Sequence, residues 1–366
     1  DVMIYFRSAL FVILSLYVQA STAQTLAGYF FNTDVTEHSE LDLDQGEMEG
    51  FLDLATPDFT SATTSYAVGG NSVKGDMSIR TIKGFSTSAP TKLAGETLYE
   101  LYRAYWGSGT YADDFVTAAL GNTAPFAGMA DISRSEFAAK GSNYQNIWMY
   151  VIHELEDAIL DCVAGDITAN GDSVNAWDEA WAFYAGSTEA GDGTTSGLMP
   201  YALAEKRCKN FGTCTGDADG DPTIGKSSIN ARLLSLYSAG QASIIAGNCG
   251  GAATILRQIV PLMTAPLVQG VLRYAWRGDP NGGNIQPPTK QRAEGWAFLA
   301  AVMPQFDYCN AARAAQIRAE MEYTSTLAGD IPSGYAAVYG MVHQVLPCLG
   351  LTCADIGGLV DAGGPT

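Results

Sequence analysis

The stretch WDEAWAF at residues 177–183 returns later in the chain as RAEGWAF at residues 292–298. A shared Glu-x-Trp-Ala-Phe pattern is improbable by chance in a chain with only six tryptophans. Each copy follows a long helical stretch that ends at Gly-Asp, at residues 165–166 and 278–279, and then a short polar loop. We therefore predict two helical repeats that pack into one bundle about a pseudo-twofold axis.

Helical periodicity extends outward from both copies of the motif. Across residues 144–163, apolar side chains such as Val151 and Leu155 recur at steps of three and four, as one buried helix face requires. The same spacing predicts helices at about 229–246, 252–276, 290–302 and 310–327. We expect an all-α, mainly helical bundle from two internal repeats, with an irregular N-terminal extension.

The chain divides into six segments on this interpretation. Residues 1–23 combine Arg7, an apolar run and small residues before Gln24, which is typical of a secretory signal peptide. The other segments are an irregular segment at 24–92 with one acidic helix at 43–54 and extended chain at 66–85, helical repeat 1 at 93–186, a linker with a Cys208/Cys214 loop at 187–228, helical repeat 2 at 229–304, and a C-terminal helix and tail at 305–366. No later apolar run reaches the length of about 18 residues that spans a bilayer. We therefore expect no transmembrane segment in the mature chain.

Acidic residues outnumber basic ones by 39 to 20, which gives a net charge of −19. This balance argues against nucleic acid and anionic membranes as partners, because both select basic surfaces. It suits a protein that collects cations, although a secreted protein from a salty habitat would be acidic as well. The sequence contains no Gly-x-Ser-x-Gly, P-loop or His-Glu-x-x-His motif, so we do not expect an enzyme.

All seven cysteines follow the predicted signal peptide, and an oxidising compartment favours disulfides between them. Short spacing suggests the pairs Cys208–Cys214 and Cys348–Cys353. Elimination then suggests Cys249–Cys309 and leaves Cys162 unpaired, but spacing does not fix connectivity and other pairings stay open.

Glu179 and Glu294 are the charged residues that both copies of the motif share. Each is flanked by Trp, Ala and Phe, so each carboxylate lies on or beside a buried face, where it needs a partner. A pseudo-twofold axis would bring the two together, and a bound cation would then relieve their repulsion. The alternative is that each glutamate caps a helix or pairs with an arginine such as Arg273 or Arg292.

A polar stripe on the helix at 144–163 provides a second set of candidate ligands. Tyr150, His153, Asp157 and Asp161 follow one another at steps of three or four. Phenolate, imidazole and carboxylate groups form a hard, oxygen-rich set that suits Fe(III) better than soft metals. We predict that iron is bound by residues drawn from His153, Asp157, Glu179 and Glu294, with Tyr150 or Tyr184 as further ligands. The alternative is a solvated acidic helix face.

A weaker cation signal lies at residues 217–221. Asp217, Asp219 and Asp221 have the one-three-five spacing of a calcium-binding loop. Pro222 stands where that loop needs glycine, and Ser228 replaces its closing glutamate. We retain Ca²⁺ at this loop only as a secondary expectation.

Several segments together resemble a known family. The two Glu-x-Trp-Ala-Phe segments, the HSELDLD stretch at 38–44 and the GNS stretch at 70–72 are similar to algal Fe-assimilating proteins, the low-iron-inducible periplasmic proteins grouped with the phytotransferrins. The resemblance implies a secreted, periplasmic or cell-surface protein that helps to capture Fe(III) for uptake through a cell-surface or endocytic partner. It further implies carbonate as a companion anion, for which Arg273 is the best cationic candidate, because its helix carries no acidic stripe.

Two other interpretations remain open from the residues. The first is an imelysin-like surface protein, since His153 and Glu156 keep the His-x-x-Glu part of that signature, whereas Val151 replaces its glycine. The second is a structural extracellular protein without bound metal.

Overall fold

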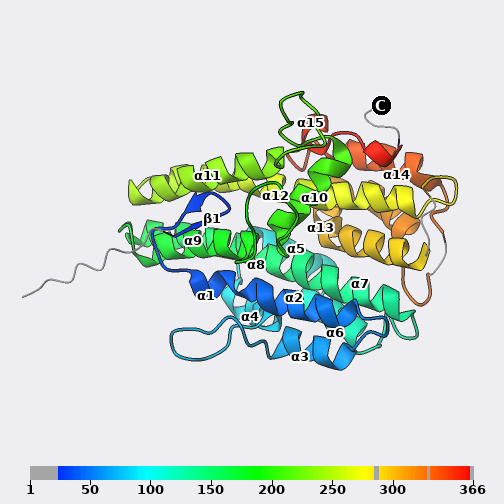
Figure 1. The fold of residues 1–366 in the computed structure, drawn as a ribbon, viewed down its shortest axis with the longest axis horizontal. Coiled ribbons are helices and arrows are strands. Elements are labelled where there is room, and N and C mark those ends of the chain that lie inside the picture. The colour runs from blue at the N-terminus through cyan, green and yellow to red at the C-terminus, as the bar shows by residue number, and fades with distance from the viewer. Residues whose placement is uncertain (1–23, 284–287, 328–329, 363–366) are drawn as a thin grey trace, which may run out of the picture.

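The structure is a computed structural model that describes residues 24–283, 288–327 and 330–362. The predicted signal peptide at 1–23 lies outside these residues. Within them the chain forms helices and one antiparallel two-stranded sheet, so the prediction of an all-α bundle is confirmed (Figure 1).

The elements follow one another along the chain in two groups. The first comprises β1 (Thr25–Leu26), β2 (Tyr29–Phe30), α1 (Thr36–Ser39), α2 (Leu41–Leu52), α3 (Phe59–Ala67), α4 (Ile82–Lys92), α5 (Thr97–Trp106), α6 (Tyr111–Leu120) and α7 (Asp131–Gly141). The second comprises the π-helix η1 (Ser142–Ile147), α8 (Trp148–Ala164), α9 (Asp172–Ala185), α10 (Pro200–Phe211), α11 (Ser228–Ile245), α12 (Cys249–Arg277), α13 (Pro288–Met321), α14 (Gly334–Val345), α15 (Cys353–Ile356) and the 3₁₀ turn η2 (Val360–Ala362).

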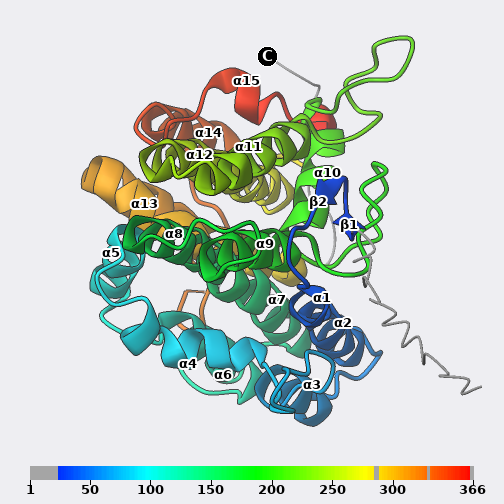
Figure 2. The same cartoon turned by 90° about the vertical axis from the view of Figure 1, so that its left-hand side faces the viewer.

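Helix α12 forms the centre of the bundle and packs against α8, α10, α11, α13 and α14. Viewed along the bundle, α11, α12 and α14 lie on one side of α8 and α9, and α1 to α4 with α6 lie on the other (Figure 2). This arrangement places α8 and α9 between the early and late parts of the chain.

The apolar composition of α12 reflects this central position. By length and composition alone it could cross a membrane, with a mean hydropathy of 1.4 in its most apolar window. The absence of a transmembrane segment from the mature chain stays a prediction. That window is 67% buried inside the bundle, as in the core helix of a globular protein.

The N-terminal segment is more regular than the sequence suggested, because it contains α1 to α4. Helix α3 shows why a Ser/Thr-rich stretch can be helical: Asp58 caps it by accepting hydrogen bonds from the amides of Thr60 and Ser61. The hydroxyl of Thr63 also bonds back to the Phe59 carbonyl, at 2.7 Å. The stretch expected to be extended at 66–85 is mostly a loop between α3 and α4.

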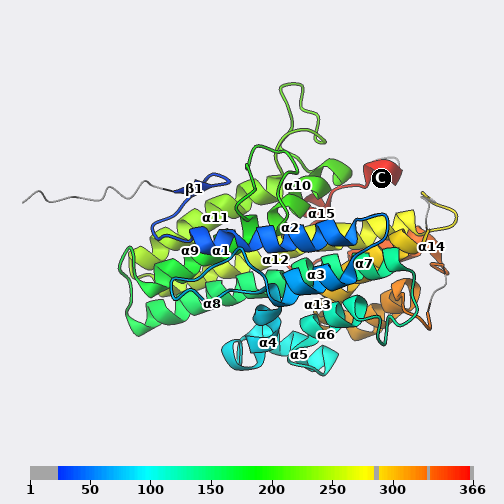
Figure 3. The ribbon, with the colours of Figure 1, turned by 60° about the horizontal axis from the view of Figure 1, so that its bottom comes forward.

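Buried polar contacts join the N-terminal segment to α9 and place α1 and α2 along the bundle (Figure 3). Asp178, inside the first copy of the motif, accepts hydrogen bonds from the Tyr29 hydroxyl at 2.8 Å and from the backbone amides of Asn32 and Thr33 at 2.8 and 3.0 Å. Asp42 of α2 likewise accepts the Thr188 amide just beyond α9. These contacts hold α1 against α9 and thereby position the candidate site.

The two copies of the motif lie on the second helices of two antiparallel pairs. Glu179 is on α9, which packs on α8, and Glu294 is on α13, which packs on α12. The internal duplication itself stays a prediction. Helix α10 lies within the predicted linker at 187–228, and α13 continues past residue 304, while the segment limits themselves stay a prediction.

The disulfides partly follow the expected pairing. Cys208–Cys214 is confirmed, whereas the expected pairs Cys348–Cys353 and Cys249–Cys309 are wrong, as is an unpaired Cys162. The end of α8 meets the start of α12, and α13 meets the chain beyond α14, so tertiary packing joins cysteines far apart in sequence. The other observed pairs are Cys162–Cys249 and Cys309–Cys348, with Cys353 free and exposed.

Candidate functional site

A polar cavity of about 640 Å³ opens beside α8 and α9. Helices α8 and α9 form one side of it, and α1, α4 and the loop before α4 form the other. Its charged and hydrogen-bonding lining includes His38 of α1, Arg80 of the loop, Lys92 of α4, Tyr150, His153, Glu154, Asp157 and Asp161 of α8, and Asp172, Asn175 and Glu179 of α9. We call it the α8–α9 cavity.

Helical spacing explains why α8 presents so many polar groups to one place. Tyr150, Glu154, Asp157 and Asp161 follow at steps of four, three and four, so they lie on one face. The opposite face packs into the core through residues such as Val151 and Leu155. The cavity is therefore the polar side of an otherwise buried helix.

Glu154 is the most unusual carboxylate in the cavity. Its residue surface is 6% exposed, and no hydrogen bond or ion pair joins its side chain to the part of the chain that the structure describes. Burial, followed by the negative charge of Glu179, raises the pKa of Glu154 well above the value of an exposed glutamate. A carboxylate in this position favours either a proton or a bound cation.

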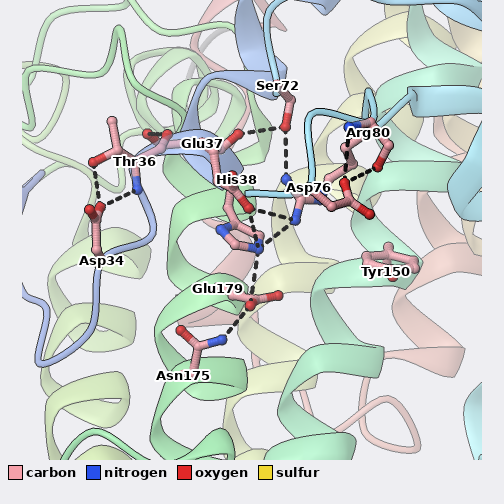
Figure 4. Close-up of polar contacts among 12 residues, drawn as sticks. Asp34, Thr36, Glu37, His38, Ser72, Asp76, Arg80, Tyr150, Asn175 and Glu179 are labelled. Carbon is pink, nitrogen blue, oxygen red and sulfur yellow. Dashed lines mark hydrogen bonds and ion pairs between the residues drawn. The ribbon is translucent and has the colours of Figure 1, made fainter. Parts of the chain in front are cut away.

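Glu179 and Arg80 both approach the same ring nitrogen of His38 (Figure 4). Glu179 Oε1 accepts a hydrogen bond from Asn175 Nδ2 at 2.6 Å and lies 3.0 Å from His38 Nε2. The same His38 nitrogen lies 2.6 Å from Arg80 Nη2. Because a ring nitrogen carries either a hydrogen or a lone pair, it cannot satisfy both a guanidinium donor and a carboxylate acceptor.

Three basic residues, Lys74, Arg80 and Lys92, line the cavity together with these carboxylates. Arg80 Nη1 donates to Ser72 Oγ at 2.9 Å, and Nη2 lies 3.4 Å from Glu37 Oε1. Lys92 Nζ donates to the Tyr150 hydroxyl at 3.0 Å. The cavity therefore contains groups of both signs, with Lys92 directly at the phenol.

The Tyr150 ring is fixed by stacking on Phe85, with ring centroids 3.6 Å apart. Burial, then Glu154 and Glu179, raises the pKa of the Tyr150 phenol well above its usual value. Tyr150 is therefore a neutral phenol in the structure as it stands, and it needs a strong Lewis acid to become a phenolate ligand.

His153 is oriented by a carboxylate behind it. Its Nδ1 lies 2.5 Å from Glu96 Oε1, and both residues are buried. If Nδ1 donates its proton to Glu96, Nε2 keeps its lone pair. This is the arrangement that carboxylates commonly impose on metal-binding histidines.

A second and larger cavity, of about 1020 Å³, is lined in part by Glu96 and shares Lys92 and Asp157 with the α8–α9 cavity. Its lining is mainly apolar, with Leu98, Leu256 and Val260 among its residues. Glu156 lies at its edge, where burial and then the charge of Glu96 raise its pKa to about 7. The polar α8–α9 cavity offers the richer set of donor groups, so it is the candidate site.

The structure brings together four of the seven residues predicted to bind metal or anion. Tyr150, His153, Asp157 and Glu179 all line the α8–α9 cavity. The other three residues are Glu294, Tyr184 and Arg273, and they do not line it.

Those three residues have partners of their own. Glu294 accepts a hydrogen bond from the Tyr274 hydroxyl at 2.8 Å, and Tyr184 donates to Asn230 Oδ1 at 2.7 Å. Arg273 forms an ion pair with Asp361 at 3.1 Å. Glu179 and Glu294 therefore do not share one site, because Glu179 lies on the α8–α9 pair and Glu294 lies on the α12–α13 pair.

Sequence reasoning missed several cavity residues for different reasons. Glu154 had a usable signal, since it lies one turn after Tyr150 and next to His153. His38, Arg80 and Lys92 had none, because they come from the N-terminal segment that Asp178 draws against α9.

The carboxylates of the predicted calcium loop make local turn contacts. Asp217 Oδ1 accepts the amides of Asp219 and Asp221 at 3.0 and 3.1 Å. Calcium binding there stays a prediction. In the described residues, no three side chains of His, Cys, Asp or Glu are already arranged to hold a metal ion.

The fold and the cavity together define a class: an all-helical protein with an acid-rich cavity that also contains phenol, imidazole and cationic groups. Residues 2–362 match the family model described as Fea1, low iron-inducible periplasmic protein. The chain therefore belongs to this family, as the motif resemblance predicted, and the imelysin-like interpretation is set aside. Comparisons with curated proteins and with solved structures found no match.

Proposed function

We propose that the protein captures Fe(III) in the α8–α9 cavity, in the periplasmic space or at the cell surface, and passes it on for uptake. The observation that carries this proposal is the pair Glu154 and Glu179. Glu154 of α8 is buried, Glu179 of the facing helix α9 is partly buried and close enough to raise the pKa of Glu154, and Glu154 has no partner among the described residues. A bound cation would offset the repulsion between the two carboxylates and would give Glu154 a partner.

The donor types in the cavity favour Fe(III) as that cation. Glu154, Glu179 and Tyr150 supply oxygen atoms, and His38 or His153 supplies an imidazole nitrogen. A hard trivalent ion prefers such a set to thiolates. Since no three acidic or imidazole groups converge in advance, binding requires side-chain rearrangement, beginning with Arg80 at His38.

The proposal includes an anion at the cationic side of the same cavity. Arg80 and Lys92 replace Arg273 as the candidate carbonate-binding residues, because both line the cavity whereas Arg273 is paired with Asp361. A carbonate bound there would supply oxygen ligands that the protein lacks and would satisfy the guanidinium donors.

Substitution of the two glutamates tests the metal site. In an Fe(III) titration near pH 8, read out by metal analysis after desalting, we expect one iron per chain and at least about tenfold weaker binding for Glu154→Gln and Glu179→Gln, since each removes a charged ligand. Glu294→Gln is the matched control, because its glutamate is buried outside the cavity. No iron in the wild type would support the structural interpretation instead, and equal losses in all three variants would contradict the assignment of iron to this cavity.

Bicarbonate dependence tests the anion. We expect removal of bicarbonate to weaken iron binding by about tenfold in the wild type, on the scale of a lost charge-assisted contact. Arg80→Gln should abolish that dependence, and Arg273→Gln should retain it. An equal response to bicarbonate in wild type and Arg80→Gln would remove Arg80 from the proposal.

A further inference from the structure

Three arginine side chains gather where the end of α12 meets α10 and η2. Arg273 and Arg277 lie one turn apart on α12 and therefore share a face. Arg207 comes from α10, which packs against both α12 and η2. Burial, then the charges of Arg207 and Arg277, lowers the pKa of Arg273, so the three groups lie within electrostatic reach of one another. We call them the Arg207–Arg273–Arg277 cluster.

A single carboxylate forms ion pairs with this cluster in the described part of the chain. Asp361 Oδ2 lies 3.1 Å from Arg273 Nη1 and 3.3 Å from Arg277 Nη2. Arg207 forms no ion pair with the described residues: its Nη1 donates to Asn210 Oδ1 at 2.9 Å, and its guanidinium lies 5.1 Å and 5.5 Å from the centres of the Phe298 and Tyr274 rings. Two positive charges are therefore left in excess, within a chain whose net charge is −19.

The cluster also contains buried donors without acceptors. Arg207 Nε, Arg273 Nη1 and Arg277 Nε are all buried and have no hydrogen-bond partner. For Arg273 the ion pair with Asp361 therefore lacks hydrogen-bond geometry. Buried guanidinium donors rarely stay unsatisfied in folded proteins, because they lose their contacts with water and gain nothing in return. Arg207 is the clearest case, since it is 6% exposed.

The ion pairs that join α12 to Asp361 of η2 do not by themselves explain the cluster. Pairing with Asp361, and the favourable position of a cation at the C-terminal end of α12, account for Arg277 and in part for Arg273. Neither accounts for Arg207, which brings a third positive charge to the place without reaching Asp361.

We propose that the Arg207–Arg273–Arg277 cluster is a second binding site, selective for a dianionic oxyanion of the phosphate type. A dianion matches the excess of two positive charges, and its several oxygens match the separate unsatisfied donors. Planar guanidinium groups bind such anions through paired hydrogen bonds. Asp361 lies half-exposed at the edge and occupies part of the site as an internal carboxylate, which the ligand displaces.

The experiment uses the full chain without iron, so that its outcome is independent of the metal proposal. Calorimetric titration at constant ionic strength compares inorganic phosphate and sulfate with chloride and acetate. We expect saturable binding of one phosphate or sulfate and at least about tenfold weaker binding of the monoanions. Arg207→Gln and Arg273→Gln should each weaken phosphate binding by about tenfold or more, whereas Arg103→Gln, an exposed arginine paired with Glu100, should not.

Asp361→Asn separates this site from a purely structural cluster. It removes the competing carboxylate, so we expect it to tighten phosphate binding by at least about tenfold. Weaker or unchanged binding in Asp361→Asn would overturn the proposal, as would equal losses in Arg207→Gln and Arg103→Gln. Because Asp361→Asn leaves all three arginines in place, it remains decisive even if an arginine variant does not fold.

Discussion

Glu154 destabilises the iron-free protein when it is ionised, and it is a proposed ligand in the iron-bound protein. Its carboxylate is buried near Glu179 and lacks a partner among the described residues, so ionisation is unfavourable until a cation arrives. The sequence placed Glu154 one residue after His153 within an acidic stripe but could not show that this stripe is buried. Only the packing of α1 and α4 over it makes it the wall of a cavity.

The raised pKa of Glu154 predicts how the stability of the iron-free protein depends on pH. A carboxyl whose pKa is higher when folded binds more protons in the folded state, so this group's contribution to stability falls as pH rises from the unfolded value near 4.5 through the folded value. We expect Glu154→Gln to unfold at higher urea concentration than wild type at pH 8 and with little difference at pH 4. A constant difference at both pH values would contradict the assigned environment.

At the scale of elements, the α8–α9 pair was largely predictable from the sequence, but the packing of α1 and α4 over it was not. Apolar steps of three and four located both helices, and the polar stripe identified Tyr150, His153 and Asp157 as neighbours. The N-terminal segment looked irregular because its apolar contacts, such as those of Phe31 and Val35, are scattered and polar contacts accompany them: Asp178 accepts hydrogen bonds from Tyr29, Asn32 and Thr33. Such contacts leave no periodic pattern in the sequence.

Asp178 therefore has an effect at a distance on the candidate site. In Asp178→Ala, the Tyr29 hydroxyl and the amides of Asn32 and Thr33 lose a buried acceptor, and we expect a loss of about 3 kcal/mol in unfolding free energy by urea denaturation. Loosening of α1 should also weaken iron binding, because α1 carries His38.

Asp219→Asn serves as the control, since Asp219 lies exposed in the loop beyond α10 and its carboxylate makes no hydrogen bond with the described residues. A destabilisation in Asp178→Ala no larger than in this control would show that the N-terminal segment is held by other contacts.

At the scale of the whole molecule, charged side chains form two separate clusters. Acidic groups collect in the α8–α9 cavity, and the Arg207–Arg273–Arg277 cluster forms at the end of α12. The repeated motif predicted a helical bundle, but it also suggested that Glu179 and Glu294 share a site. Tertiary packing places them on separate helix pairs. The same packing sets the long-range disulfides Cys162–Cys249 and Cys309–Cys348, which spacing did not predict, whereas spacing did predict the local pair Cys208–Cys214.

The central claim is the location of iron, and diffraction recorded on either side of the iron absorption edge tests it most directly. In crystals of the iron-loaded protein we predict one anomalous peak in the α8–α9 cavity, at about 2.0–2.2 Å from carboxylate oxygens of Glu154 and Glu179, as for carboxylate-bound transition metals. A peak outside this cavity, for example at Glu294 or the acidic loop at 217–221, or no peak in protein that retains iron in solution, would contradict the account.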